Sequence, residues 1–145
     1  MLKKLLEAGE PLIVPGVYDA LSAVIAEQAG FEVLYVSGFA VSGSLLGQPD
    51  IGLITASEMI GRVSQISAAV SHVPVIADGD NGYGDEAGVA KLVNAYEQAG
   101  VQCIQLEDQV SPKRCGHMDN KEVVSLEEAR SKIAAAVAAR NSSDF

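Results

Sequence analysis

Short apolar runs bounded by glycine or proline alternate along the chain with longer segments whose apolar residues recur at helical spacing. This alternation predicts a parallel sheet whose strands are joined by crossover helices. The predicted strands are Pro11–Val14, Val33–Val36, Val73–Ala77 and Val101–Leu106. The predicted helices are Asp19–Ala29, Thr55–Val70, Asp85–Gln98 and Ser125–Arg140. The pattern therefore predicts four consecutive βα units.

Local signals refine these elements. Thr55 and Glu58 have the spacing of a capping box, and Gly30 is a C-terminal stop for the first helix. The segment 37–47 is rich in glycine and small residues, so we expect a loop there. The last helix has an apolar stripe that we expect to pack closely on the sheet. The stripe consists of Ala129, Ile133, Ala136 and Val137.

The length and composition suit one domain. The chain has 145 residues, of which 48% are hydrophobic, and its mean hydropathy is +0.21. No linker or internal repeat divides it, so we expect residues 1–145 to form a single domain. A (β/α)8 barrel needs about 250 residues, and four units make half of one. Because a half barrel leaves a sheet edge and its inner face uncovered, we expect the chain to continue in a longer protein, to dimerise or to close differently.

Charge and cysteine use narrow the class of protein. With 10 basic and 19 acidic residues the net charge is −9, and no basic stripe offsets it, which argues against nucleic acid and anionic membrane as partners. The chain has no apolar stretch of membrane-spanning length and no signal-peptide pattern at its start. Its two cysteines have neither zinc-site nor disulfide spacing. We therefore expect a soluble cytoplasmic protein.

Carboxylates follow two of the predicted strands. Asp78 and Asp80 follow the third strand, and Glu107 and Asp108 follow the fourth. Because the carboxyl ends of parallel strands meet at one edge of a sheet, these groups should converge. Side chains alternate along a strand, so only one of Glu107 and Asp108 should point into the site. The first pair alone would also suit a plain turn. The two pairs together predict a site for Mg²⁺, or alternatively Mn²⁺.

The polar loop after the fourth strand carries Cys115. The residues that flank it are Lys113, Arg114, Gly116 and His117. Positive charge nearby favours a thiolate, and such a thiol can act as acid or base. We expect Cys115 to be accessible and Cys103, inside the fourth strand, to be buried and inert. A redox-sensing thiol is the alternative for Cys115, although no second cysteine is close in sequence.

The end of the second strand offers possible anion ligands. Its residues are Tyr35, Ser37, Gly38 and Phe39. A hydroxyl and free backbone N–H groups at this position can hold a carboxylate or phosphate, although Ser-Gly after a strand is also common loop chemistry.

Four segments together resemble the isocitrate lyase and phosphoenolpyruvate mutase superfamily. They are YVSG after the second strand, PDIG in the next loop, ADGDNGYG after the third strand and LEDQVSPKRCGH after the fourth. The Lys-Arg-Cys-Gly-His run is the most specific of these, and the resemblance extends from about Pro15 to Arg140. It implies an α/β protein of the (β/α)8 TIM-barrel family, with this chain as the N-terminal half of a barrel lyase. It also implies a homo-oligomer, which is a tetramer in the full-length family.

The resemblance also implies roles for particular residues. Asp78, Asp80 and Glu107 match the carboxylates that hold Mg²⁺, several of them through water. Cys115 matches the catalytic thiol of the carbon–carbon lyases, on a mobile gating loop. The other matches lie around a small carboxylate substrate. These are Tyr35, Ser37, Gly38, Phe39, Asp50, Lys113, Arg114, Gly116 and His117.

The implied activity is a Mg²⁺-dependent carbon–carbon lyase. It would cleave a 2-hydroxy di- or tricarboxylate, similar to 2-methylisocitrate, into a 2-oxo acid and a dicarboxylate by a retro-aldol reaction. Two alternatives stay open: an enzyme similar to carboxyphosphonoenolpyruvate mutase or oxaloacetate decarboxylase, and a non-catalytic half barrel that self-associates. The family takes further substrate-binding groups from strands five to seven, so an isolated half can bind Mg²⁺ weakly while doing no chemistry.

Overall fold

The computed structural model describes residues 1–145, which form one four-stranded sheet and six helices. The strands are β1 (Gly16–Val17), β2 (Leu34–Val36), β3 (Val75–Asp78) and β4 (Cys103–Gln105). The helices are α1 (Leu2–Glu7), α2 (Ala20–Gln28), α3 (Gly38–Leu46), α4 (Ala56–Ala69), α5 (Glu86–Gln98) and α6 (Leu126–Ala139). None of these helices is long and apolar enough to cross a bilayer.

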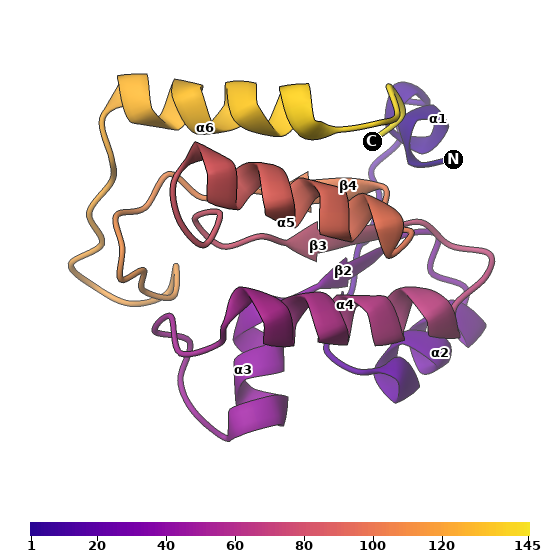
Figure 1. The fold of residues 1–145 in the computed structure, drawn as a ribbon. Coiled ribbons are helices and arrows are strands. Elements are labelled where there is room, and N and C mark those ends of the chain that lie inside the picture. The colour runs from indigo at the N-terminus through magenta and orange to yellow at the C-terminus, as the bar shows by residue number, and fades with distance from the viewer.

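The strands are all parallel and stand in the order β1-β2-β3-β4, so neighbours in the sequence are neighbours in the sheet. Helices α2, α4 and α5 lie in the connections between successive strands, and α6 follows β4 (Figure 1). The four predicted βα units are therefore confirmed. Because the strands are parallel, the loops that follow β2, β3 and β4 all emerge at one edge of the sheet.

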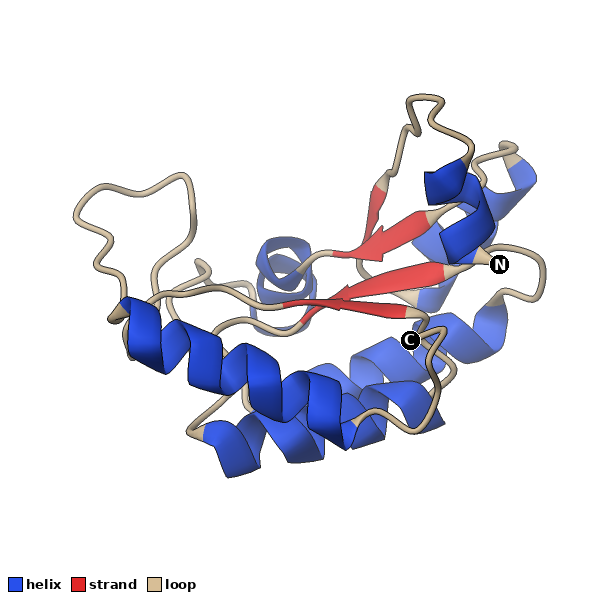
Figure 2. Ribbon diagram, turned by 90° about the horizontal axis from the view of Figure 1, so that it is seen from above, coloured by secondary structure: helices blue, strands red, loops and turns tan.

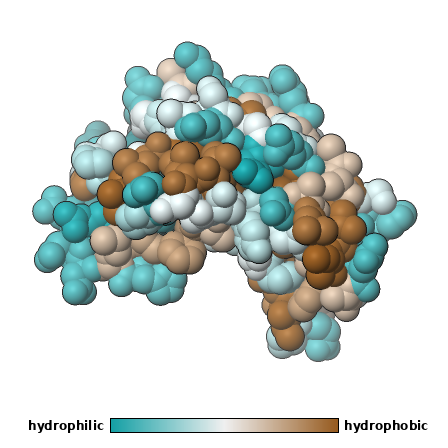
Figure 3. All heavy atoms as spheres, turned by 90° about the horizontal axis from the view of Figure 1, so that it is seen from below, coloured by the Kyte–Doolittle hydropathy of each residue, from teal (hydrophilic) through white to brown (hydrophobic).

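The helices cover only one face of the sheet. In Figure 2 the long helices lie together below the strands, and the opposite face carries no helical layer. Seen from below, the molecule is hollowed on that uncovered side (Figure 3). The sheet therefore has the shape of an open half barrel, with its inner face turned to the hollow.

Strand register separates the core from the hollow. Leu34 pairs with Val75 and Val36 with Ala77, and all four side chains are buried on the helical side. They pack against residues from four helices, among them Val41, Met59, Val63, Ile66 and Leu92. Burial of each such side chain stabilises the fold by about 1.5–3 kcal/mol. Tyr35 and Ile76 alternate with the core residues and are only half-buried, because they face the hollow.

The predicted strand at Pro11–Val14 is wrong, because the first strand is Gly16–Val17. Its register is set by the Tyr35 N–H, which donates to the carbonyl of Pro15, and by the Ser37 N–H, which donates to that of Val17. The upstream segment has prolines at both ends, which lack the N–H that a ladder needs. Ile13 in that segment is 78% exposed.

The expected loop at 37–47 is also wrong, because α3 occupies residues 38–46. The Ser37 hydroxyl accepts a hydrogen bond from the Ala40 N–H at 3.4 Å and caps this helix. Gly47 ends it in a left-handed conformation with φ of 62°. Two glycines and two serines disguise the helical pattern, since these residues have low helix propensity.

The apolar stripe of α6 does not pack on the sheet as expected. Helix α6 lies along α5, and none of its residues is buried. Ile133 and Val137 are about half exposed, and they line a cavity of about 230 Å³ beside the edge strand β4. The edge strand and this stripe are thus uncovered together.

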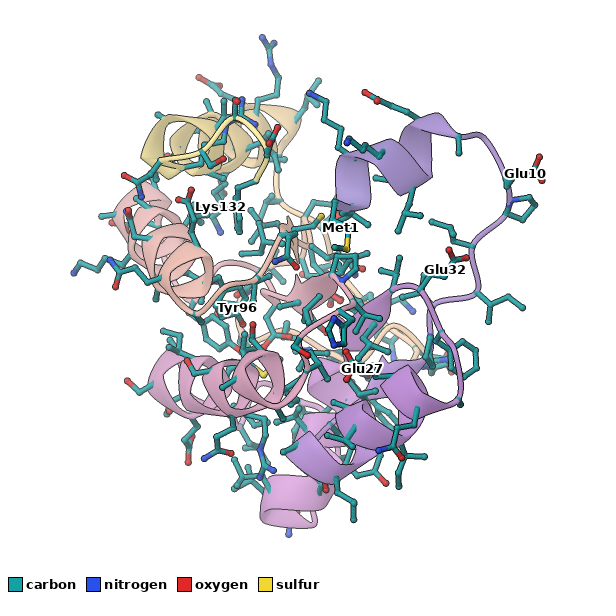
Figure 4. The ribbon with its side chains drawn as sticks, turned by 90° about the vertical axis from the view of Figure 1, so that its right-hand side faces the viewer. Met1, Glu10, Glu27, Glu32, Tyr96 and Lys132 are labelled. Carbon is teal, nitrogen blue, oxygen red and sulfur yellow. The ribbon has the colours of Figure 1, made fainter.

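Tyr96 joins the helical layer to the end of β3. It is fully buried on α5, on the side that faces α4 (Figure 4), and its hydroxyl donates a 2.6 Å hydrogen bond to the carbonyl of Asp78.

We predict that Tyr96→Phe lowers the free energy of unfolding by about 1–3 kcal/mol, because the buried carbonyl loses its donor. Urea denaturation measures this. The exposed Tyr18 provides the control Tyr18→Phe, and equal effects of the two substitutions would contradict the prediction.

Candidate active site

The pairing of β3 with β4 continues beyond the strand ends and brings the acidic residues together. The Gly79 N–H donates to the carbonyl of Gln105 at 2.8 Å, and the Glu107 N–H donates to the carbonyl of Asp80 at 2.7 Å. A side chain at Gly79 would come within 2.8 Å of Ile104, so this close approach requires glycine. The two strand ends therefore converge as the sequence predicts.

Asp78 is held by backbone donors. Its Oδ2 accepts from the Gly38 N–H and its Oδ1 from the Asp80 N–H, both at 3.0 Å. A Cβ at Gly38 would lie 2.8 Å from the Asp78 carboxylate and 3.5 Å from that of Asp80. Glycine at 38 therefore allows the start of α3 to approach both carboxylates.

Lys113 supplies a cation to the acidic cluster. Its side chain is 4% exposed, and its Nζ lies 2.8 Å from the Asp50 carboxylate and also contacts that of Asp80. Burial alone would lower the pKa of Lys113, but hydrogen bonds and charge from Asp50 and Asp80 outweigh it and raise the pKa. Lys113 therefore stays protonated and neutralises part of the negative charge.

Burial, together with the negative charge nearby, raises the pKa values of Asp78 and Glu107. Burial, followed by the charge of Asp80, raises the pKa of Asp78. Burial also raises the pKa of Glu107, and Asp78, Asp80 and Asp50 add to this effect while Lys113 opposes it. Asp108 is exposed, so Glu107 is the member of its pair that lies with the cluster. A bound cation would relieve this repulsion.

Cys115 belongs to the loop after β4, and its side chain points into the protein rather than to solvent. It is 7% exposed, and its N–H donates to the carbonyl of Asp50 at 2.9 Å. Its Sγ is 3.5 Å from Nδ1 of His117, and the His117 ring is 6.3 Å from that of Phe39. The expectation of an accessible Cys115 is wrong, because Lys113 and Asp50 draw the loop inward. Cys103 is only half-buried on the edge strand, so the expectation that this second thiol is buried is wrong.

The expected positive charge beside the thiol is not supplied by Lys113. Its ammonium points to Asp50 and Asp80, and the side chain that contacts the sulfur is His117. Within the Lys-Arg-Cys-Gly-His run, Lys113 thus contacts the carboxylates and His117 contacts the thiol of Cys115. Arg114 and Gly116 face the solvent.

The end of β2 lies at the same cluster. Burial and the charge of Asp78 raise the pKa of Tyr35 well above its ordinary value. Two backbone donors that were expected to be free here are occupied, because the Ser37 N–H donates to the carbonyl of Val17 and the Gly38 N–H donates to Asp78. Phe39 is exposed and faces His117. The structure therefore brings the predicted site residues to one edge of the sheet, apart from the outward-facing Arg114 and Gly116.

The donor set fits a hydrated divalent cation. The carboxylates of Asp78, Asp80 and Glu107 lie close enough to influence one another's charge, and this repulsion favours a cation among their hard oxygens. No three carboxylate, imidazole or thiol groups converge closely enough to hold an ion alone. Mg²⁺ usually keeps several waters and takes one or two protein carboxylates, so this looser arrangement suits it.

Sequence reasoning missed two polar residues of the site. Gln109 is buried and binds both Glu107 and the loop. The Tyr83 hydroxyl is buried without a hydrogen-bond partner, and Tyr83 lines a cavity of about 340 Å³ with Asp80 and Lys113. Both residues stand within the segments that carry the resemblance, which was the available signal, but neither is a carboxylate, a histidine or a cysteine.

Comparison with known proteins identifies the class. The sequence profile of the family described as Phosphoenolpyruvate phosphomutase matches residues 2–145. The 2,3-dimethylmalate lyase of Eubacterium barkeri is 47% identical over 144 residues, which cover 99% of this chain and 50% of that protein. The 2-methylisocitrate lyase of Aeropyrum pernix is 47% identical over 140 residues, which cover 97% of this chain and 45% of that protein.

Structural comparison agrees. The crystal structure of a phosphonopyruvate hydrolase in complex with oxalate and Mg²⁺ matches with a TM-score of 0.89 and 38% identity, covering 99% of this chain and 48% of that one. The chain therefore belongs to the isocitrate lyase and phosphoenolpyruvate mutase superfamily of (β/α)8 barrel enzymes, and its sheet and helices correspond to half a barrel. It spans about half the length of the curated relatives it matches.

Two glycines of α3 provide a matched test of the Asp78 contact. We predict that Gly38→Ala lowers the free energy of unfolding, because the new methyl group displaces the Asp78 carboxylate from its backbone donors. Gly43→Ala, where nothing lies within 4 Å, should raise it by about 0.5–1 kcal/mol, since alanine favours the helix. Urea denaturation compares the two, and stabilisation by both would contradict the close approach.

The raised pKa of Glu107 predicts a pH dependence of stability. The folded chain binds a proton at Glu107 more tightly than the unfolded chain, so this group's contribution falls as pH rises from the ordinary glutamate pKa through the folded one. Without metal, Glu107→Gln should therefore be more stable than wild type near neutral pH, with the difference shrinking on acidification. Urea denaturation in EDTA across this range measures it. A difference that grows on acidification would contradict the sign of the shift.

Proposed function

We propose that this chain carries the metal-binding and thiol half of a Mg²⁺-dependent carbon–carbon lyase active site. The proposed substrate is a 2-hydroxy di- or tricarboxylate similar to 2-methylisocitrate, which is cleaved to a 2-oxo acid and a dicarboxylate. The observation that carries the proposal is the position of Cys115 on a loop held to the carboxylate cluster through Asp50 and Lys113. The thiol, as the proposed acid, and the carboxylates, as the proposed metal ligands, thus lie at the same edge of the sheet.

Asp78, Asp80 and Glu107 are the proposed metal ligands. Bound Mg²⁺ would act as a Lewis acid toward the oxygens of the substrate's 2-hydroxy acid group. The backbone N–H groups of Gly38 and Asp80 hold Asp78 in place for this role. Glu107 is also the proposed acceptor of the substrate's hydroxyl proton at the start of cleavage.

Cys115 is the proposed general acid. When the carbon–carbon bond breaks, its electron pair stays on the leaving dicarboxylate, and the thiol proton of Cys115 is transferred to that carbon. His117, 3.5 Å from the sulfur, can orient the thiol and return a proton to it. Burial of Cys115 excludes water, which would otherwise compete as a proton source.

The substrate's carboxylates have several proposed contacts. The end of β2, with Tyr35, Ser37, Gly38 and Phe39, borders the cluster on one side, and Asp50 and Lys113 border it on another. His117 would reach the substrate from the loop, and Arg114 and Gly116, which are exposed to solvent, would reach it when the loop moves. The oxalate and Mg²⁺ bound by the similar phosphonopyruvate hydrolase support a small carboxylate with a divalent metal as the ligand pair.

The same proposal includes assembly and location. Exposed apolar side chains on α2 and α3, among them Leu21, Ile25, Leu45 and Leu46, support a homo-oligomer. The two free cysteines support a reducing compartment such as the cytoplasm.

A mutase-like or decarboxylase-like enzyme is the second candidate, because the relatives include both carbon–carbon lyases and a phosphonopyruvate hydrolase. Such activities should not need the thiol. The experiment on Cys115 therefore separates the two candidates.

We predict that Cys115→Ser lowers the rate of 2-oxo acid release from 2-methylisocitrate or 2,3-dimethylmalate by about 10²–10⁴-fold, because the general acid is lost. The assay mixes the full-length gene product with Mg²⁺ and a panel of 2-hydroxy acids and measures the 2-oxo acid. Cys103→Ser is the control and should keep the wild-type rate. Release of no 2-oxo acid from any panel member would contradict the lyase, and turnover of oxaloacetate or phosphonopyruvate unaffected by Cys115→Ser would favour the second candidate.

A further inference from the structure

We propose that Gln109 is a positioning residue that ties the Cys115 loop, residues 108–124, to the carboxylate of Glu107. The proposal rests on the proposed function, in which Cys115 and Glu107 act in one reaction. It assigns to Gln109 the task of keeping the thiol closed over the carboxylate cluster.

The Gln109 side chain uses three hydrogen bonds in a buried position. The residue is 8% exposed. Its Nε2 donates to the Glu107 carboxylate and to the carbonyl of Arg114, both at 2.9 Å, and its Oε1 accepts from the Arg114 N–H at 3.1 Å. One amide therefore bridges a candidate metal ligand and the backbone next to the thiol.

The orientation of this amide is fixed by its partners. The Arg114 N–H requires an acceptor, so it must face the oxygen of Gln109. The NH₂ group then faces two acceptors, the Arg114 carbonyl and the Glu107 carboxylate, and it has one hydrogen for each. Only a side chain that carries both an acceptor and two donors can make this set of contacts.

The backbone around Cys115 is therefore held from two sides. Gln109 binds the N–H and C=O of Arg114, and the carbonyl of Asp50 accepts from the Cys115 N–H. With these bonds in place, and with Lys113 bound to Asp50 and Asp80, Cys115 is 7% exposed. Loss of the Gln109 contacts should let the loop open more often and expose the sulfur.

Gln109 itself stands on the fixed stem of the loop. It forms an antiparallel bridge with Val123, and the Val110 N–H and Val124 N–H donate to the carbonyls of Glu122 and Asp108. The side chain of Gln109 thus runs from this stem to the segment that carries the thiol. Because it also binds Glu107, a displacement of that carboxylate is passed to the loop through one amide.

Gln109→Glu tests this role with almost no change of shape. The introduced carboxylate can still accept from the Arg114 N–H, but it has no hydrogen for Glu107 or for the Arg114 carbonyl. Like charges then repel where a hydrogen bond stood. Added negative charge by itself disfavours a thiolate and slows alkylation, so faster alkylation of Cys115 in this variant reports opening of the loop.

The experiment measures iodoacetamide alkylation of each cysteine by mass spectrometry of the whole chain without metal. We expect Gln109→Glu and Gln109→Ala to raise the Cys115 rate at least tenfold and to leave the Cys103 rate within twofold. Gln98→Ala, an exposed glutamine on α5, is the matched control and should change neither rate. Glu107→Ala should also raise the Cys115 rate, and Gln109→Glu added to it should raise the rate by less than the product of the two single effects.

A Cys115 rate within twofold of wild type in Gln109→Glu would overturn the proposal. A parallel rise at Cys103 would overturn it as well, since that result means general loosening of the chain. If the double variant raised the Cys115 rate by the full product of the two single effects, the two residues would act separately, and the proposed tie between them would be overturned. Alkylation requires neither metal nor substrate, so a failure of the lyase assay would leave this result standing.

Discussion

The buried contact of the Lys113 ammonium with Asp50 and Asp80 is the interaction on which the site depends. Parallel pairing places the ends of β2, β3 and β4 at one edge, and the close backbone approaches there leave carboxylates crowded and partly dehydrated. Their repulsion must be offset by positive charge. Lys113 supplies it and, because it belongs to the Cys115 loop, brings the thiol to the cluster at the same time. The same contact of Lys113 thus balances the charge of the cluster and fixes the position of the Cys115 loop.

The proposed metal site and Lys113 share one carboxylate. Asp80 serves both Lys113 and the proposed metal site, so the two cations draw on the same negative charge. Gln109 and Asp50 also hold the backbone beside Cys115, through hydrogen bonds that do not involve Asp80. The thiol can therefore stay close to the cluster while the lysine yields part of its contact. The uncovered inner face of the sheet leaves the hollow side of the cluster open to a substrate and to further structure (Figure 2).

Much of the fold follows from the sequence, because its signals are local. The capping box of Thr55 and Glu58 sets the start of α4, and the left-handed Gly30 and Gly100 follow the ends of α2 and α5. The convergence of Asp78 and Glu107 follows from parallel topology alone. The wrong predictions depend on contacts between distant parts of the chain. The position of β1 is set by its partner β2, and α3 is stabilised by Ser37 and by burial of Val41 despite its glycines. Cys115 is buried because Lys113, in the same loop, turns toward distant carboxylates. The role of Gln109 could not be predicted, because the folded shape of the loop brings its side chain to Glu107 and Arg114.

The central claim is that the acidic ends of β3 and β4 share one divalent cation. The most direct measurement is the anomalous scattering of Mn²⁺ in crystals of the protein grown with this ion. Our account predicts one Mn²⁺ among the side chains of Asp78, Asp80 and Glu107, with water completing its coordination. Mn²⁺ bound elsewhere, with these three carboxylates unoccupied and Lys113 still in contact with Asp80, would contradict it.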